Sequence, residues 1–190
     1  NDCWILSDEV YRGAELDGDE CPSFFGGYEK TIVNAGLSKA YRLPGLRIGW
    51  TVGPVEYIKK AWAFHDYTSI SIAYHSDWVA SKVLETKRRK MILNGTKDHL
   101  NQNLDTLVQW VDTLNGKLSI NKPQAGAIAF TKLNIPKSCE DLTYHLRDKY
   151  SVLLTAGKWF GLDGFIRFGF GPPNDYLISA LNRIENAIKS

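Results

Sequence analysis

The sequence predicts an α/β fold: part of a sheet with helical connections, followed by a smaller α+β unit. Short apolar strands in the first third are separated by loops and helices rather than by tight hairpins. A long stretch with helical periodicity follows, and a second set of strands ends in a closing helix. The 190 residues, 44% hydrophobic and 23% charged, fit one globular domain or slightly more.

Three apolar segments of the first third are predicted strands, at residues 3–7, 30–34 and 46–52. The first segment, Cys-Trp-Ile-Leu-Ser, is apolar enough to predict a buried strand with neighbours on both sides. Residues 13–27 are rich in Gly, Asp and Glu and predict a surface loop. The order strand, loop, strand, turn, strand therefore favours a mixed α/β sheet.

The middle of the chain is predicted to be helical. Pro54 suits the first turn of a helix. Apolar residues at helical spacing predict a long helical region over residues 77–114, interrupted near Asn94-Gly95. Four tryptophans fall on apolar faces and are expected to lie mostly in the core: Trp62, Trp78, Trp110 and Trp159.

The last third alternates strands and helices. The predicted strands are residues 118–120, 126–133, 152–154 and 165–170, and the predicted helices are residues 141–150 and 173–188. We therefore expect three parts: residues 1–72 as part of an α/β sheet, residues 73–115 as a connecting helical region, and residues 116–190 as an α+β unit.

Composition excludes several function classes. The net charge of +2, from 23 basic and 21 acidic residues, is too balanced to indicate nucleic acid or an anionic membrane as a partner. No apolar run is long enough to span a membrane. The three cysteines include no CxxC pair and suit a reducing cytoplasm, and the four histidines lack metal-ligand spacing, so no metal site is expected.

Lys39 is the most informative position for chemistry. It follows a predicted strand in Ser38-Lys39, where a solvated surface charge would be the ordinary interpretation. A desolvated lysine near another cation instead has a lowered pKa and forms an imine with an aldehyde. Arg47, eight residues later, offers a planar fork of donors suited to phosphate, and Ser38 adds a hydroxyl.

Asp8 and Tyr11 lie at the end of the first predicted strand, at a spacing that lets both face one ligand. A carboxylate can keep a ring nitrogen protonated, and a phenol can donate to a phenolate oxygen. A lysine amine, an acidic partner for a pyridinium and phosphate donors are the groups that pyridoxal 5'-phosphate requires.

These residues occur in two motifs that resemble the class I/II aminotransferases, pyridoxal-phosphate enzymes of fold type I related to aspartate aminotransferase. The first motif is Asp8-Glu9-Val10-Tyr11, and the second is GLSKAYRLPGLRIGW over residues 36–50. The second motif is long and specific, whereas Asp-x-x-Tyr alone is a weak signal. The resemblance implies that residues 1–72 are the C-terminal part of the cofactor-binding large domain, and that residues 116–190 are the C-terminal small domain.

The resemblance continues through residues 123–130, 157–161 and 165–170. At the family position that binds the substrate α-carboxylate this chain has Arg167. The resemblance also implies a homodimer, and it covers only the C-terminal half of the family's length. The family often has Ser or Thr three residues before the lysine, where this chain has Gly36, so Ser38 and Arg47 are expected to carry more of the phosphate binding.

The function implied by this resemblance is pyridoxal-phosphate-dependent transfer of an amino group from an amino acid to a 2-oxo acid, in a ping-pong sequence. Lys39 is the expected catalytic residue, acting as nucleophile and general base. Two alternatives remain open. One is another reaction with the same cofactor, such as β-elimination, decarboxylation or cyclisation. The other is a non-catalytic fragment that acts as an interaction module.

Overall fold

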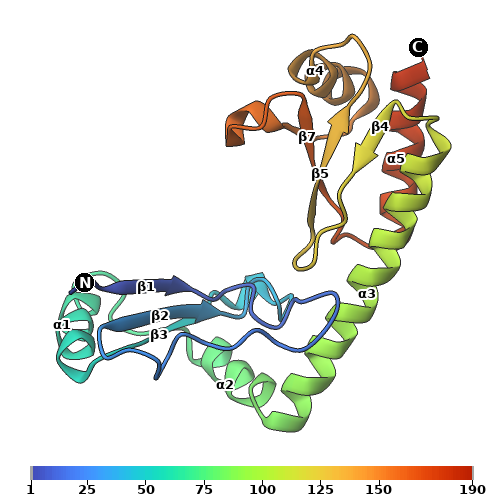
Figure 1. Cartoon of the computed structure of the whole chain (residues 1–190). Helices are drawn as coiled ribbons and strands as arrows, with labels where there is room; N and C mark the ends of the chain where they lie inside the picture. The colour runs from blue at the N-terminus through green and yellow to red at the C-terminus, as the bar shows by residue number, and fades with distance from the viewer. Residues whose placement is uncertain (1, 190) are drawn as a thin grey trace. The chain divides into compact units, whose positions relative to one another are not determined.

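The computed structural model describes residues 2–189. The chain divides into two compact units, unit 1 (Asn1–Lys97) and unit 2 (Asp98–Ser190). Figure 1 shows strands and helices in both, as the α/β prediction requires. Within the described residues, no helix combines the length and apolar character needed to cross a membrane.

Unit 1 contains a three-stranded mixed sheet in the order β1-β2-β3. Its strands are β1 (Ile5–Asp8), β2 (Thr31–Gly36) and β3 (Gly49–Val52). β1 and β2 are parallel, and β3 is antiparallel to β2 with Gly49 opposite Gly36. The ends of β1 and β2 and the beginning of β3 therefore meet at one edge of the sheet, where polar side chains gather.

The prediction that the first strand is buried is wrong for this chain. β1 begins at Ile5 and pairs only with β2, so it is an edge strand among the described residues. Leu6 is 68% exposed, and Trp4 just before the strand is also exposed. Apolar composition predicted the strand itself correctly, but burial depends on a second neighbouring strand, which the described residues do not supply.

The core of unit 1 lies around the segment that follows β2 rather than over the sheet. It contains Ala14, Leu37, Ala40, Tyr41, Ile48, Ala80, Val83 and Leu93. Apart from Ala14, which lies in the loop after β1, these residues come from the region of the short helix η1 (Pro44–Leu46), from α2 (Tyr74–Val83) and from the beginning of α3 (Thr86–Thr113). The segment that carries Ser38 and Lys39 is therefore anchored on both sides by buried apolar residues.

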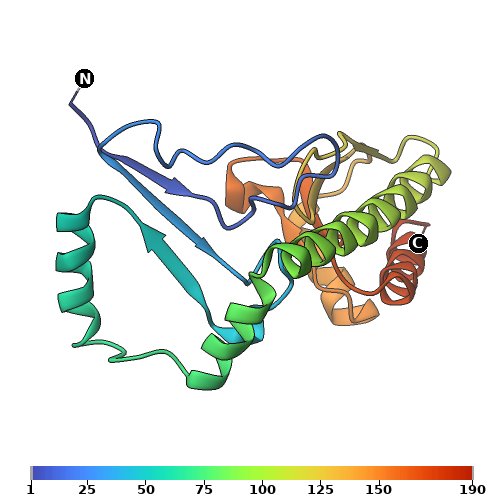
Figure 2. The same cartoon turned by 90° about the horizontal axis from the view of Figure 1, so that it is seen from below.

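Helix α1 (Val55–His65) contains no buried residue. Residues 66–73 connect α1 to α2 and have no regular secondary structure, as Figure 2 shows. Trp62 and Trp78 are 66% and 56% exposed, and Trp159 of unit 2 is exposed as well, so of the four expected core tryptophans only Trp110 is buried. Helical spacing identified the apolar faces, but it cannot say whether the chain itself covers them.

Helix α3 is continuous from Thr86 to Thr113, and the predicted interruption near Asn94-Gly95 is wrong. The helical break lies earlier, between α2 and α3 at Leu84 and Glu85. A glycine inside a helix costs only about 1 kcal/mol relative to alanine. Buried leucines on both sides of Gly95, at positions 93 and 100, outweigh that cost.

Unit 2 contains a four-stranded antiparallel sheet in the order β4-β5-β7-β6. Its elements are β4 (Leu118–Ile120), β5 (Ile128–Leu133), α4 (Cys139–Tyr150), β6 (Thr155–Ala156), η2 (Gly157–Phe160), β7 (Phe165–Gly169) and α5 (Asn174–Lys189). The strand predicted at residues 152–154 is wrong, since pairing with β7 begins only at Thr155.

The two faces of this sheet differ in character. Ala129 lies opposite Phe168 in the register of β5 and β7, and both are buried. Trp110 of α3 packs its ring 6.1 Å from that of Phe168, on this buried face. Phe130 and Arg167 form the next pair in the register and point to the other face, where they are only partly buried.

Asn103 joins α3 to the chain that follows β7. It is fully buried, and its side-chain amide donates hydrogen bonds to the carbonyl oxygens of Phe170 at 2.8 Å and Pro172 at 2.7 Å. Its oxygen accepts a hydrogen bond from the Asn174 side chain at 2.9 Å. A buried polar group with all these partners fixes the turn between β7 and α5, and thereby the end of the strand that carries Arg167.

We expect Gly157→Ala to destabilise unit 2 by about 2–4 kcal/mol. A β-carbon at this position would lie 2.3 Å from the carbonyl oxygen of Leu162 and 2.8 Å from that of Phe165. Backbone atoms must move to make room. Denaturant unfolding of the variant measures the change, with Gly169→Ala as control because its β-carbon would meet nothing within 4 Å. Equal midpoints for the two variants would contradict the prediction.

Candidate cofactor and substrate site

Five of the six predicted site residues belong to one edge of the unit 1 sheet. Asp8 ends β1, and Tyr11 follows it by three residues. Ser38 and Lys39 follow the end of β2, and Arg47 precedes the beginning of β3. Because β1 and β2 are parallel and β3 is antiparallel to them, the connection that leaves β1 and the one that joins β2 to β3 both begin at this edge.

Lys39 presents an exposed amine beside an aromatic ring. Its Nζ lies 5.8 Å from the centroid of the Tyr11 ring. Its carbonyl oxygen accepts a hydrogen bond from the Arg42 amide at 2.9 Å, which closes a turn at this position. Within residues 2–189 the Lys39 ammonium makes no ion pair, so its nitrogen remains available to a ligand.

Asp8 lies in a polar strip that crosses the sheet. One of its carboxylate oxygens accepts a hydrogen bond from the Val10 amide at 3.2 Å, and the side chain is exposed. Asn34 is opposite Asp8 in the register, and Thr51 is opposite Asn34. The Thr51 hydroxyl donates to the Asn34 Oδ1 at 2.7 Å. The sequence analysis missed this pair, because only the strand register places it beside Asp8.

Ser38 and Arg47 are the candidate phosphate donors. Ser38 is half-buried, and Arg47 is exposed. Arg47 has a φ of 54°, in the left-handed region, where it ends η1. Its Nη1 donates to the Pro44 carbonyl oxygen at 2.8 Å. The other donors of the guanidinium fork remain free for an anion, and a fork of this kind matches phosphate oxygens in pairs.

Gly36 provides no hydroxyl, and its surroundings disfavour a larger residue. A β-carbon there would lie 3.0 Å from the Ile48 carbonyl oxygen, closer than ordinary contacts. Two phosphate donors, a free amine and a carboxylate nevertheless stand at one edge of the sheet. This donor set fits pyridoxal phosphate, whose phosphate, aldehyde and ring nitrogen need these partners.

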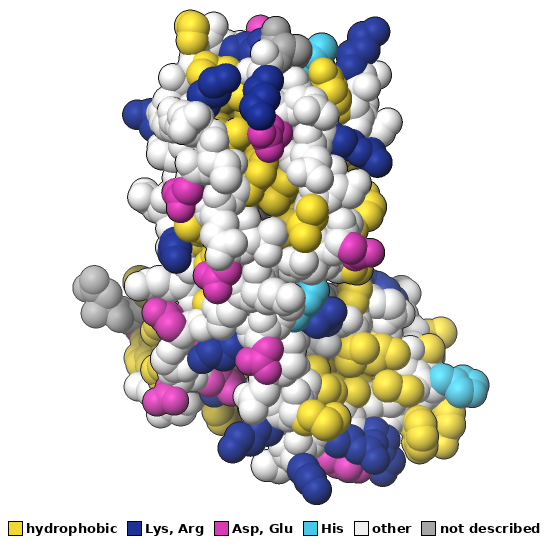
Figure 3. All heavy atoms as spheres, turned by 90° about the vertical axis from the view of Figure 1, so that its right-hand side faces the viewer, with side chains coloured by type: hydrophobic (Ala, Val, Ile, Leu, Met, Phe, Trp, Pro, Cys, Tyr) yellow, Lys and Arg dark blue, Asp and Glu magenta, His cyan; other side chains and the backbone are white. Residues whose placement is uncertain are grey.

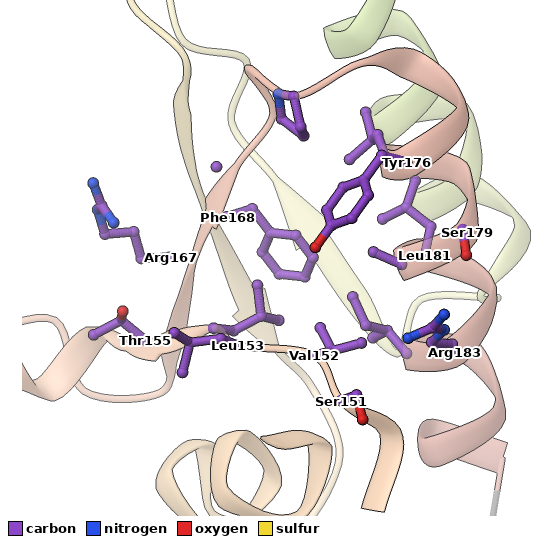
Figure 4. Close-up of a pocket in the computed structure, with 16 residues that line it drawn as sticks. Ser151, Val152, Leu153, Thr155, Arg167, Phe168, Tyr176, Ser179, Leu181 and Arg183 are labelled. Atoms are coloured by element: carbon purple, nitrogen blue, oxygen red, sulfur yellow. The ribbon is translucent and has the colours of Figure 1, made fainter. Parts of the chain in front are cut away.

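Arg167 lies in unit 2, in the middle of β7. Figure 4 shows its side chain leaving the strand on the side opposite to Phe168, Tyr176 and Arg183. A cavity of about 340 Å³ lies between β7, residues 151–155 and α5. Arg167 is among the residues that line this cavity, and its side chain leaves β7 on the face of the sheet that also carries Phe130.

An ion pair ties the turn after β6 to helix α4. The Lys158 ammonium bonds to a carboxylate oxygen of Glu140. This hydrogen bond lowers the pKa of Glu140 and raises that of Lys158. Both side chains are therefore charged at neutral pH. Because the pKa of Glu140 is lowered in the folded chain, the stability that the pair contributes is lost only when the pH falls below the ordinary pKa of a glutamate and Glu140 becomes protonated.

Residues 1–184 match the family model described as aminotransferase class I and II. The chain belongs to this family. Class I and II aminotransferases use pyridoxal phosphate, in agreement with the donor set at the edge of the unit 1 sheet.

Curated relatives in the class I and II aminotransferases include enzymes with different reactions. The chain is 25% identical to an aspartate aminotransferase of Pyrococcus horikoshii over 190 residues, which is 98% of this chain and 48% of the relative. It is 28% identical to a capreomycidine synthase of Streptomyces vinaceus over 152 residues, which is 80% of this chain and 39% of the relative.

A solved aminotransferase structure shares the fold. The crystal structure of a pyridoxal-phosphate-dependent aminotransferase from Streptococcus suis is 32% identical, with a TM-score of 0.88, and the match covers 98% of this chain and 48% of that one. The chain thus spans about half the length of this structure and of the aspartate aminotransferase relative. The predicted fold, part of a fold type I large domain followed by a small domain, is confirmed.

Proposed function

We propose that this chain is the C-terminal half of an aminotransferase that moves an amino group from an amino acid to a 2-oxo acid. The observation that carries the proposal is the edge of the unit 1 sheet, where the free Lys39 amine stands with Asp8 and Arg47. We further propose that residues 1–72 belong to the cofactor domain and 116–190 to the small domain, with 73–115 connecting them.

In this proposal the five site residues of unit 1 have different tasks. Ser38 and Arg47 bind the cofactor phosphate, Asp8 keeps a proton on the ring nitrogen, and Tyr11 donates to the ring oxygen. When bound, pyridoxal phosphate supplies an aldehyde for the amino group and a ring that withdraws electrons from the substrate α-carbon. Lys39 would hold the cofactor through its amine before substrate arrives, and the same amine would carry the substrate α-proton as general base.

Arg167 is proposed to bind the α-carboxylate of the substrate. Its guanidinium presents two parallel N–H donors, which match the two oxygens of a carboxylate. Within the described residues no ion pair or hydrogen bond engages this guanidinium, whose Cζ lies 5.6 Å from the centroid of the Phe160 ring. An uncommitted arginine of this kind has its full donor set available for a ligand.

A cyclisation with the same cofactor is the second candidate. The similarity to a capreomycidine synthase supports a reaction other than transamination, because that relative is named as a synthase and not as an aminotransferase. The same anchoring residues serve both reactions, so the choice depends on the substrate rather than on the residues at the edge of the sheet.

We also propose that the protein forms a homodimer in the cytoplasm. Large hydrophobic side chains of α1 and the segment after it are exposed, including Trp62, Phe64, Tyr67 and Ile70. Figure 3 shows hydrophobic side chains gathered at the surface of unit 1, in the lower part of the view. Apolar surface of this kind is typical of an interface. Light scattering distinguishes a dimer from a monomer.

The proposed compartment rests on the cysteines. Cys3 and Cys21 are both exposed and free, which suits a reducing compartment such as the cytoplasm.

The test of the proposed reaction is product analysis in the longest native form of the protein, loaded with pyridoxal phosphate. A panel of amino acids is supplied with and without 2-oxoglutarate as acceptor. Conversion of both partners, with a new amino acid formed from the acceptor, is the expected result. A product formed without the acceptor would contradict transamination: a cyclic product would indicate cyclisation, carbon dioxide would indicate decarboxylation, and ammonia would indicate β-elimination.

A further inference from the structure

The guanidinium of Arg167 lies over an aromatic ring. Its Cζ lies 5.6 Å from the centroid of the Phe160 ring. Contact with the face of an aromatic ring attracts a cation without occupying its N–H donors. Phe160 can thus hold the guanidinium in place and leave both arms of the fork free for a ligand.

The Phe160 ring is itself held by the sheet. It meets the Phe130 ring at 5.7 Å in an edge-to-face arrangement, with an interplanar angle of 77°. Phe130 is the residue opposite Arg167 in the register of β5 and β7. The three side chains therefore contact one another in series: Arg167 of β7 contacts Phe160, and Phe160 contacts Phe130 of the neighbouring strand β5.

The turn that presents Phe160 has little freedom. Gly157, at its beginning, has no room for a β-carbon, and Gly161, at its end, has a φ of 74° in the left-handed region. The Leu162 amide donates to the Gly157 carbonyl oxygen at 2.9 Å and closes the turn. The ion pair of Lys158 with Glu140 ties the same turn to α4.

We propose that Phe160, supported by Phe130, is a positioning residue that fixes the guanidinium of Arg167 for bidentate binding of the substrate carboxylate. The proposal deepens the proposed function and rests on it for the identity of the ligand. The contact itself is a property of unit 2 and does not depend on that identity. An arginine that is ordered before binding loses less side-chain entropy when the carboxylate arrives.

The first arm of the test examines the contact in the chain of 190 residues, without substrate or cofactor. An aromatic ring face shifts the NMR signals of the groups above it. We expect the Arg167 Hε and Hδ signals to be displaced in the wild type, to move to random-coil positions in Phe160→Leu and to stay displaced in Phe160→Tyr. Arg167→Lys assigns the signals. Signals at random-coil positions in the wild type would overturn the proposal.

The second arm measures steady-state kinetics in the full-length protein that contains this chain. We expect Phe160→Leu to raise KM for the amino acid about 3- to 10-fold with kcat nearly unchanged, the factor that matches the energy of a cation–π contact. Phe160→Tyr keeps the ring and is expected to restore KM. Unfolding midpoints of the variants are measured in parallel, since a purely structural role would lower them without separating KM from kcat.

Tyr150→Leu is the matched control, because it removes another aromatic contact in the same unit, with the His145 ring at 5.4 Å between ring centroids. It is expected to leave KM unchanged. Displaced Arg167 signals together with an unchanged KM in Phe160→Leu would overturn the positioning role. A wild type without transamination would instead overturn the proposed function, and the NMR arm would still decide whether Phe160 orders Arg167.

Discussion

Replacement of Lys39 by alanine is expected to remove reductive labelling by pyridoxal phosphate and borohydride, and to lower transamination by at least about 10³-fold. The reason is that one amine performs two tasks, binding the aldehyde and carrying the α-proton. The exposed Lys39 ammonium lies 5.8 Å from the centroid of the Tyr11 ring, and among the described residues it has no ion pair that a ligand must break. Peptide mass after borohydride reduction locates the label, and a coupled assay measures turnover.

Two variants make this result specific. Lys39→Arg keeps the positive charge but cannot act as a nucleophile, so it is expected to be as inactive as the alanine variant. Lys87→Ala removes an exposed lysine on α3 and is expected to leave labelling and turnover unchanged. Label on several lysines in the wild type, or substantial turnover in Lys39→Ala, would contradict the assignment of Lys39.

Replacement of Arg167 by alanine is expected to lower kcat/KM by about 10²- to 10³-fold, the factor for losing about 3–4 kcal/mol of paired charge interaction. The loss arises because the substrate carboxylate then has no guanidinium to neutralise it. The larger part of the effect is expected in KM. Arg167→Lys restores the charge but not the fork, so it should fall between the wild type and the alanine variant.

Arg147→Ala controls for the loss of an arginine in the same unit. Arg147 is exposed on α4 and pairs with Asp148. Its removal is expected to leave kcat/KM unchanged, while both alanine variants keep the unfolding midpoint of the wild type. The carboxylate role of Arg167 would be contradicted if an amine without a carboxyl group lost as much activity in Arg167→Ala as an amino acid does.

Much of the site could be predicted because its residues are close in sequence to strand ends. Asp8 ends one strand and Lys39 follows another, as the motifs predicted, and the parallel pairing of the two strands, which the motifs did not predict, brings both residues to one edge. The contact between Phe160 and Phe130 could not be predicted in this way. It depends on the register of β5 and β7 and on a turn whose shape comes from backbone contacts at Gly157.

Predictions of burial failed where a strand or helix has an apolar face but no other element among the described residues covers that face. The strand at Ile5–Asp8 was predicted with the right type, yet Leu6 is exposed because β1 has one neighbour among the described residues. Residues 152–154 show a related failure. Val152 is buried and Leu153 is 81% exposed, an alternation typical of a strand, but no ladder forms there. Periodicity reports side-chain direction and not hydrogen-bond partners.

The boundary between the two units falls inside α3, between Lys97 and Asp98, rather than in a loop. In an α-helix each amide bonds to the carbonyl oxygen four residues earlier, so the first amides of unit 2 depend on the last carbonyls of unit 1. Leu93 is buried in one core and Leu100 on the next stretch of the same helix. Fraying of the turns before Lys97 therefore removes hydrogen-bond acceptors from the helical residues after it, so α3 is expected to unfold as one segment.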